Sequence, residues 1–125
     1  MKKAIATSKA PAAIGPYSQG IEANGFVYVS GQLPVDAATG EFAPGGAKEQ
    51  AKQSLLNIKA ILTEAGLSMD DIVKTTVFIK NMGDFAAVNE VYASFFEGAC
   101  PARSCVEVAA LPKGALVEIE AIAAR

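Results

Sequence analysis

The sequence predicts an α+β fold in which two helices pack on one face of a mixed β-sheet. Two amphipathic stretches, residues 47–65 and 84–98, are separated and flanked by runs of β-branched and aromatic residues. The resulting order of strands, helix, strand, helix and two strands favours a sheet of four to six strands. Because 125 residues is the length of one domain, we expect a single domain over residues 1–125.

The first half of the chain should contain an extended N-terminal segment, a turn, a strand and the longer helix. The Gly15-Pro16 pair indicates a turn that leads into a strand, and residues 26–31 have the β-branched and aromatic composition of a strand. Within residues 47–65, apolar side chains recur every three or four positions, which is typical of an amphipathic helix. Gly66 stands where a helix commonly ends in a left-handed residue.

The second half should contain a strand and a shorter helix before the last two strands. Residues 72–79 have the composition of a strand, and Asp84 is expected to cap the helix that follows. The apolar stripe of that helix comprises Phe85, Val88, Tyr92 and Phe95. We expect the helix to end near Gly98, because Pro101 cannot continue it.

The last two strands, expected over residues 102–108 and 116–123, carry charged side chains in alternation. Since side chains alternate between the faces of a strand, one set in the first of these strands comprises Arg103, Cys105 and Glu107. The simplest packing places the apolar members of both strands under the helices, namely Val106, Val108, Val117 and Ile119. Arg103 is then expected to meet Glu118 and Glu120 on the uncovered face of the sheet.

The uncovered, charged face allows two interpretations. It could be a solvated surface with cross-strand ion pairs, each worth about 0–1 kcal/mol. Cys105 and one of the two alternating sets of residues 26–31 share this face, and such apolar neighbours suit a ligand pocket or a subunit interface better. Ser30 and Gly31 could bring a hydroxyl and a backbone amide close to a ligand, or could simply end their strand.

Composition and charge argue against several classes of function. The chain has no histidine, which removes the commonest general base, the Ser-His-Asp and Cys-His nucleophile systems and most zinc sites. Its 11 basic and 13 acidic residues give a formal charge of -2, whereas nucleic-acid-binding proteins usually carry a basic surplus. We therefore expect neither a metal site nor a nucleic-acid partner.

The sequence also indicates the cellular setting. No apolar run reaches the roughly 18 to 20 residues of a membrane span, and residues 1–8 lack the apolar region of a signal peptide. We expect a cytoplasmic protein without a membrane partner. Cys100 and Cys105 lie five positions apart, which in an extended segment spans about 16 Å and exceeds the roughly 4.4–6.8 Å between the Cα atoms of a disulfide. We expect two inert, free thiols.

Four motifs resemble those of the RidA/YjgF/UK114 family of reactive-intermediate deaminases, in order over essentially the whole chain. They are Gly15-Pro16-Tyr17-Ser18-Gln19, Ser30-Gly31-Gln32, Pro101-Ala102-Arg103-Ser104 and Glu118-Ile119-Glu120-Ala121. The resemblance implies a chorismate-mutase-like fold and a homotrimer with clefts between adjacent subunits. It also implies hydrolysis of 2-imino or 2-enamino acids, such as 2-aminoacrylate and 2-iminobutyrate, to 2-oxo acids and ammonia, without a cofactor.

On this resemblance, Arg103 and Glu118 are the expected catalytic residues. The planar Arg103 guanidinium would bind the substrate carboxylate through paired hydrogen bonds. Glu118 would orient or deprotonate the attacking water, and we expect the nearby guanidinium to favour the ionised form of Glu118. Further substrate-binding candidates are Tyr17 of the adjacent subunit, Ser30, Gly31, Asn89, Cys105 and Glu120.

Some of these roles stay open. Without the resemblance, Tyr17 fits a packing aromatic, and Glu120 could belong to an ion pair or to the centre of the trimer. Cys100 stands where relatives more often carry a bulky residue, which leaves the size of the substrate undecided. Two other functions compete with deamination. One is a non-catalytic 2-oxo acid-binding or chaperone-like trimer, and the other is an endoribonuclease or translation inhibitor, which the charge and the missing histidine argue against.

Overall fold

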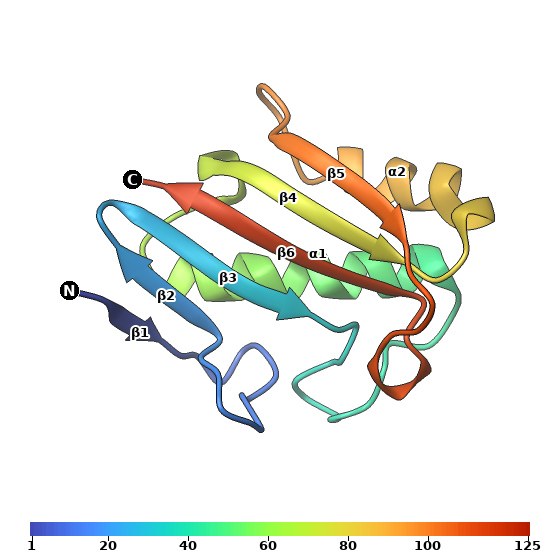
Figure 1. Ribbon diagram of the computed structural model, residues 1–125, viewed down its shortest axis with the longest axis horizontal. Coiled ribbons are helices and arrows are strands. Elements are labelled where there is room, and N and C mark those ends of the chain that lie inside the picture. The colour runs from blue at the N-terminus through green and yellow to red at the C-terminus, as the bar shows by residue number, and fades with distance from the viewer.

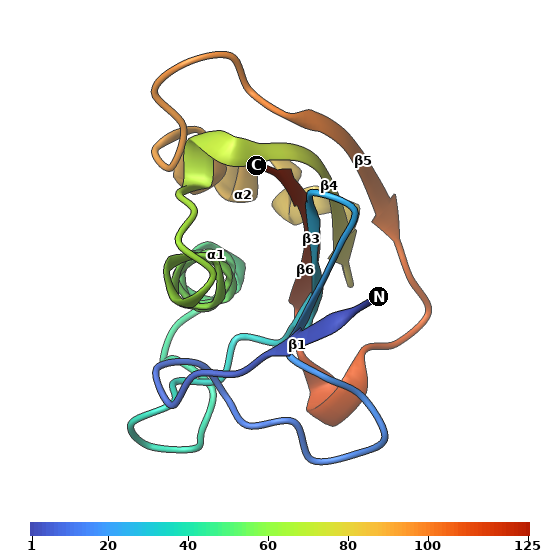
Figure 2. The same ribbon diagram turned by 90° about the vertical axis from the view of Figure 1, so that its left-hand side faces the viewer.

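The computed structural model describes residues 1–125 as one six-stranded sheet with two α-helices on one side of it (Figures 1 and 2). The strands are β1 (Lys3–Ile5), β2 (Gly20–Ala23), β3 (Phe26–Gln32), β4 (Ile72–Ile79), β5 (Ala102–Glu107) and β6 (Val117–Ala124). Their order is β1-β2-β3-β6-β4-β5, and only the pair of β4 and β5 is parallel. The predicted class, a mixed sheet covered by two helices on one face, is confirmed.

The longer helix, α1 (Ala47–Glu64), lies along the sheet and differs from the predicted range by one residue. It ends as its sequence indicates, because Gly66 has a φ of 78° and Leu67 N donates to Leu62 O at 2.8 Å. At its start the Glu49 carboxylate accepts from Gly46 N at 2.8 Å. Neither this helix nor the shorter one is long and apolar enough to cross a bilayer.

The shorter helix, α2 (Phe85–Ala93), ends well before the predicted boundary near Gly98. After the helix, the backbone hydrogen bonds join residues three apart, since Phe95 N donates to Tyr92 O and Phe96 N donates to Ala93 O. This turn rotates Phe96 into the core, 5.0 Å from the Tyr92 ring between centroids, and leaves Phe95 only half-buried. Phe95 packs against the core as predicted, but it lies past the end of the helix instead of on its apolar stripe.

The core lies between the sheet and the two helices. Its largest fully buried apolar side chains are Val27, Leu55, Ile58, Ile61, Leu62, Val77, Ile79, Val88, Val117 and Ile119. Alternate residues of β6 from Val117 to Ala123 face this core, which confirms the predicted division of that strand. The other face of the sheet carries no helix (Figure 2).

The predicted orientation of β5 is wrong. In the parallel ladder, Arg103 lies beside Thr75 and Cys105 lies beside Val77, and both of these β4 residues are buried under the helices. Residues side by side on neighbouring strands share a face. Arg103 and Cys105 therefore face the helix side, while Val106 lies on the open face with 41% of its surface exposed.

The reason is the position of β5 at the edge of the sheet. None of its six residues is fully buried, and Val108 lies half-buried just past its end. On such a strand, alternation separates two sets of side chains but hydrophobicity does not decide which set faces the core. The uncharged set of β5 faces outward here, beside Lys74, Thr76 and Phe78 of β4.

A β-bulge interrupts β3 at Ser30-Gly31. Val29 pairs with Ala121 and Gln32 pairs with Ile119, so three steps along β3 match two steps along β6. The extra residue lets both Val29 and Gln32 face the interior. It also brings Gly31 against the neighbouring strand at the point where the candidate site begins.

Candidate functional site

A cleft of about 550 Å³ opens at the end of β3. Residues of three segments line it, namely those within 7–17, 31–40 and 112–113. Tyr17, the Gly31 backbone and Lys113 bring polar groups to walls that are otherwise largely apolar. Sequence reasoning missed Lys113, whose φ of 59° places it in the left-handed region between Pro112 and Gly114. The Pro-Lys-Gly turn was the available signal.

Gly31 and Glu118 touch across β3 and β6. An added Cβ at Gly31 would lie 2.8 Å from Glu118 Oε2 and 3.0 Å from Glu118 Cδ. The carboxylate thus occupies the space above a residue that has no side chain, on the open face of the sheet and beside the cleft. The two predicted site residues are therefore direct neighbours in the fold.

Burial raises the pKa of Glu118, and the negative charge of Glu120 raises it further. The expectation that Arg103 favours the ionised form of Glu118 is wrong for the chain by itself, because the guanidinium is not among the groups that shift this pKa. A carboxylate with a raised pKa is a stronger base. Glu120 is exposed and belongs to neither of the two ion pairs of the chain.

Tyr17 and Ser30 lie on the same side of the molecule as Glu118. Tyr17 is exposed and lines the cleft together with Gly31. The Ser30 hydroxyl donates to Ser18 O at 2.6 Å, and Ser30 N donates to Gln19 O at 2.9 Å. Ser30 therefore fastens the segment that carries Tyr17 to β3, and its hydroxyl has lone pairs rather than a proton to offer a ligand.

Arg103 lies in a second cluster, formed with α2. Its Nη1 donates to Asn89 Oδ1 at 2.6 Å, and its guanidinium carbon lies 5.5 Å from the centroid of the Phe85 ring and 4.9 Å from that of Tyr92. Such contacts are cation–π interactions, each worth about 0.5–1 kcal/mol for an exposed cation such as Arg103. The Tyr92 and Thr75 hydroxyls are 2.6 Å apart and anchor that ring to β4.

The two cysteines flank this second cluster. Burial raises the pKa of the Cys105 thiol, and the nearby Arg103 opposes that shift only in part. Cys105 packs against the core, Cys100 is exposed, and both cysteines are free in the structure. Phe85 and Tyr92 were predicted only as core residues. Helical periodicity does not indicate that their rings also contact the Arg103 guanidinium.

The structure thus groups the candidates into two clusters rather than one. Tyr17, Ser30, Gly31, Glu118 and Glu120 belong to the first, and Arg103, Asn89 and Cys105 belong to the second. The first lies at the cleft and the open face, whereas the second lies on the helix side of β5. The prediction that Arg103 meets Glu118 on one face of the same chain is therefore wrong.

Known proteins with similar sequences cover nearly the whole chain. The family model described as endoribonuclease L-PSP matches residues 7–125. The 2-iminobutanoate/2-iminopropanoate deaminase of Escherichia coli K12 is 56% identical and covers 100% of this chain and 99% of its own. The mouse protein of the same name is 51% identical and covers 98% of this chain and 91% of its own.

Solved structures agree with the fold. Escherichia coli TdcF, crystallised with bound serine, has a TM-score of 0.95 and 53% identity, with 98% of each chain covered. The YjgF gene product of Escherichia coli has a TM-score of 0.95 and 56% identity, again with 98% of each chain covered. Family model, identity and fold agree, and the chain belongs to the RidA/YjgF family.

Proposed function

We propose that this protein hydrolyses small 2-imino acids to 2-oxo acids and ammonia, in a site built from two copies of the chain. The observation that carries the proposal is the state of Arg103. Its guanidinium is oriented by Asn89 and two aromatic rings, yet it has no carboxylate partner within the chain. An oriented and unpaired guanidinium is suited to a substrate carboxylate.

The first cluster, which contains Glu118, supplies the base. The substrate is an iminium carboxylate, and its C2 carbon is already electrophilic. Glu118 takes one proton from a water molecule while the water oxygen bonds to C2 and the C=N π electrons move to nitrogen. The resulting carbinolamine receives the proton from Glu118 at nitrogen, and the C–N bond then breaks to release ammonia. As C=O forms, the hydroxyl gives its proton back to Glu118, which passes it to the ammonia. Water and the iminium acid have then become a 2-oxo acid and ammonium.

The same groups accommodate an enamine acid such as 2-aminoacrylate. Protonation of its C3 carbon gives the corresponding iminium acid, which then follows the steps above. Tyr17 and the Gly31 backbone would hold the substrate by hydrogen bonds beside Glu118. No step requires a cofactor or a metal.

Two copies are needed because Arg103 and Glu118 lie on opposite faces of one sheet. The open face supplies a surface for a second copy, since Phe26, Tyr28 and Val106 expose 40%, 45% and 41% of their surfaces there. Phe26 and Tyr28 lie side by side, with ring centroids 6.4 Å apart, and Val106 lies on the edge strand at the other side of the sheet. Apolar side chains exposed in this way are typical of subunit interfaces. A homotrimer, in which each copy gives Glu118 to one cleft and Arg103 to the next, satisfies both requirements. We place this assembly in the cytoplasm, where free thiols such as Cys100 persist.

The names of the curated relatives support the reaction, because the Escherichia coli and mouse proteins are both called 2-iminobutanoate/2-iminopropanoate deaminase. The test is to generate 2-iminobutyrate enzymatically in the presence of the protein and to follow 2-oxobutanoate release. We expect release to be faster than in buffer, in proportion to the protein concentration. Calorimetric binding of 2-oxobutanoate without faster release would instead identify a binding protein and overturn the proposal.

A further inference from the structure

Each wall of the cleft is tied to the body of the fold by one buried side-chain amide. Gln19, Asn57 and Gln50 are respectively 4%, 1% and 7% exposed. We infer that these three amides are positioning residues for the proposed reaction, and that Gln19 sets the place of Tyr17. The inference rests on the proposed function, because that function makes the cleft part of the active site. The hydrogen bonds of the three amides do not depend on it.

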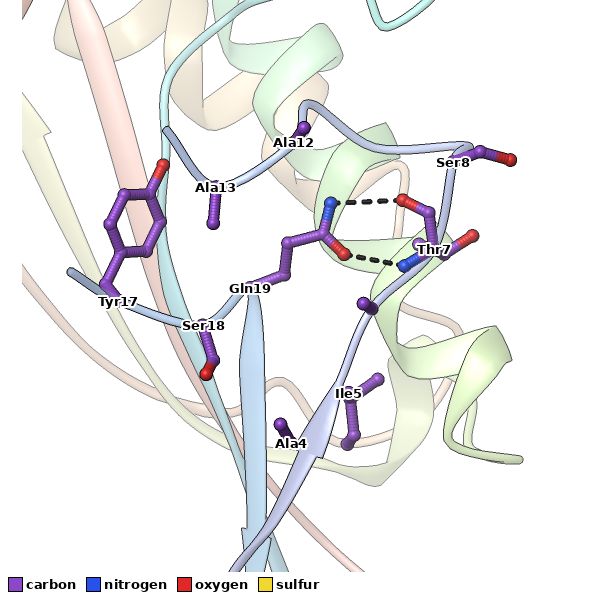
Figure 3. A pocket seen from close by; sticks show the side chains of 10 residues that line it. Ala4, Ile5, Thr7, Ser8, Ala12, Ala13, Tyr17, Ser18 and Gln19 are labelled. Carbon is purple, nitrogen blue, oxygen red and sulfur yellow. Dashed lines mark hydrogen bonds between the residues drawn. The ribbon is translucent and has the colours of Figure 1, made fainter. Parts of the chain in front are cut away.

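Gln19 holds the first wall through one accepted hydrogen bond and an amide nitrogen whose two protons are shared among three carbonyl oxygens. Its Oε1 accepts from Thr7 N at 2.7 Å, and its Nε2 lies within donating distance of Thr7 O (3.1 Å), Ala10 O (3.2 Å) and Pro11 O (2.7 Å). Figure 3 shows the Gln19 side chain reaching across to Thr7, with Tyr17 two residues before it along the chain. Residues 7–11 belong to no strand or helix. For Thr7, Ala10 and Pro11, this one amide supplies the backbone partners that regular structure would otherwise provide.

Tyr17 is held only through its neighbours. Its own backbone N donates locally, to Gly15 O at 2.8 Å. The segment is fastened on one side by Gln19 and on the other by Ser30, whose hydroxyl bonds to Ser18 O. The place of the Tyr17 ring beside the cleft therefore follows from these two fastenings.

The other two amides act on the remaining walls in the same way. Asn57 Nδ2 donates to Leu33 O at 3.2 Å and to Val35 O at 2.9 Å, and both of these residues line the cleft. Gln50 Oε1 accepts from Leu116 N at 2.8 Å and so ends the loop that carries Lys113. Both amides belong to α1, the longest and best-packed element.

Stability alone does not explain this arrangement. A buried amide gives little net stability compared with an apolar side chain of the same shape, because its desolvation offsets its hydrogen bonds. The three amides instead fix the positions of the loops that form the cleft walls, which have no regular secondary structure to hold them. All three meet backbone of the cleft walls, including the loop that ends at Leu116, rather than one another.

The experiment compares Gln19→Met with Leu62→Ala. Methionine keeps the length of glutamine and removes every hydrogen bond, whereas Leu62→Ala loosens the core at the far end of α1 without touching the cleft. We expect Gln19→Met to raise KM for 2-iminobutyrate about tenfold, the effect of roughly one lost hydrogen bond, with a smaller change in kcat. Hydrogen exchange should accelerate over residues 7–17 alone. Leu62→Ala should leave KM unchanged while lowering the thermal midpoint.

The outcomes separate this inference from the proposed function. If Gln19→Met alters neither KM nor exchange over residues 7–17, beyond what Leu62→Ala does, the inference is wrong while deamination stands. If the wild-type protein does not hydrolyse imines, the proposed function fails, and exchange together with 2-oxobutanoate affinity still decides the role of Gln19. If Gln19→Met does not fold, Gln50→Met and Asn57→Leu carry the same prediction for residues 112–116 and 33–35, and normal KM and exchange in both would refute it.

Discussion

The carboxylate of Glu118 rests on the bare backbone of Gly31, so close that an added Cβ would lie 2.8 Å from Oε2. Two separate sequence features make this contact possible. The bulge in β3 brings Gly31 against β6, and the alternation of β6 places Glu118 on the open face. The contact fixes where the proposed base can stand, because any side chain at position 31 would occupy the same space.

Gly31→Ala should therefore displace the Glu118 carboxylate. We expect kcat to fall at least about tenfold, since a shift of about 1 Å in a reacting group can cost as much as 100-fold. The unfolding temperature should change little, because the end of the Glu118 side chain can move away. Gly98→Ala is the matched control, as an added Cβ there meets nothing within 4 Å. Steady-state kinetics with equal losses in both variants would refute a special role for this contact.

Removal of the Arg103 guanidinium should weaken substrate binding far more than removal of another arginine. We expect Arg103→Ala to lower kcat/KM about 100-fold or more, the cost of losing a charged group that pairs with a substrate carboxylate. Arg103→Lys should restore only part of the loss, because an ammonium cannot make the planar, paired contact. Arg125→Ala, which breaks an ion pair with Glu22 at the other end of the sheet, is the control. Comparable kcat/KM values for Arg103→Ala and Arg125→Ala would contradict the assignment.

The raised pKa of Glu118 predicts an acidic limb in the pH profile. Burial lifts this pKa above the usual value of 4.5, and the substrate carboxylate neutralises Arg103 in the complex. The base is active when ionised, so kcat should fall as the pH decreases through the raised pKa. Glu118→Gln should lower kcat strongly and remove this limb, after the uncatalysed rate is subtracted at each pH. A limb that persists unchanged in Glu118→Gln would assign it to another group.

Tyr92 should show separable effects of its ring and its hydroxyl. Tyr92→Phe keeps the ring under Arg103 but leaves the buried Thr75 hydroxyl without its partner at 2.6 Å. We expect a loss of stability of about 1–3 kcal/mol with little change in KM. Tyr92→Leu removes the ring that lies 4.9 Å from the guanidinium, and KM should rise several-fold. Denaturant melts and kinetics on both variants check this division, and identical KM values would argue against support by the ring.

Much of the fold follows from local pattern. The predicted strand 72–79 has the bounds of β4, and α1 differs from its prediction by one residue. These elements are buried along one full face, so their periodicity is enforced by packing. The end of α2 was not predicted because the turn after Ala93 depends on which of two adjacent phenylalanines enters the core.

The sequence predicted which residues are candidates for the site, but it did not predict how they lie relative to one another. Arg103 and Glu118 were singled out by motif, yet alternation could not assign a face to Arg103 on an edge strand that has no fully buried residue. Lys113 was not recognised as a residue of the cleft because it reaches the cleft through a left-handed turn. Gln19 and Asn57 were not recognised as supports of its walls because each bonds to backbone that is distant in sequence. Such contacts appear only once the chain is folded.

The central claim is that Arg103 of one copy and Glu118 of another form one site. The most direct measurement is complementation, in which Arg103→Ala and Glu118→Gln chains are unfolded together, refolded as an equal mixture and assayed. Each chain alone should be nearly inactive. In random mixed oligomers, about a quarter of the sites combine an intact Arg103 with an intact Glu118, so about a quarter of the wild-type activity should return. If the refolded mixture stays as inactive as either variant, although size analysis shows that mixed oligomers formed, the shared site is wrong.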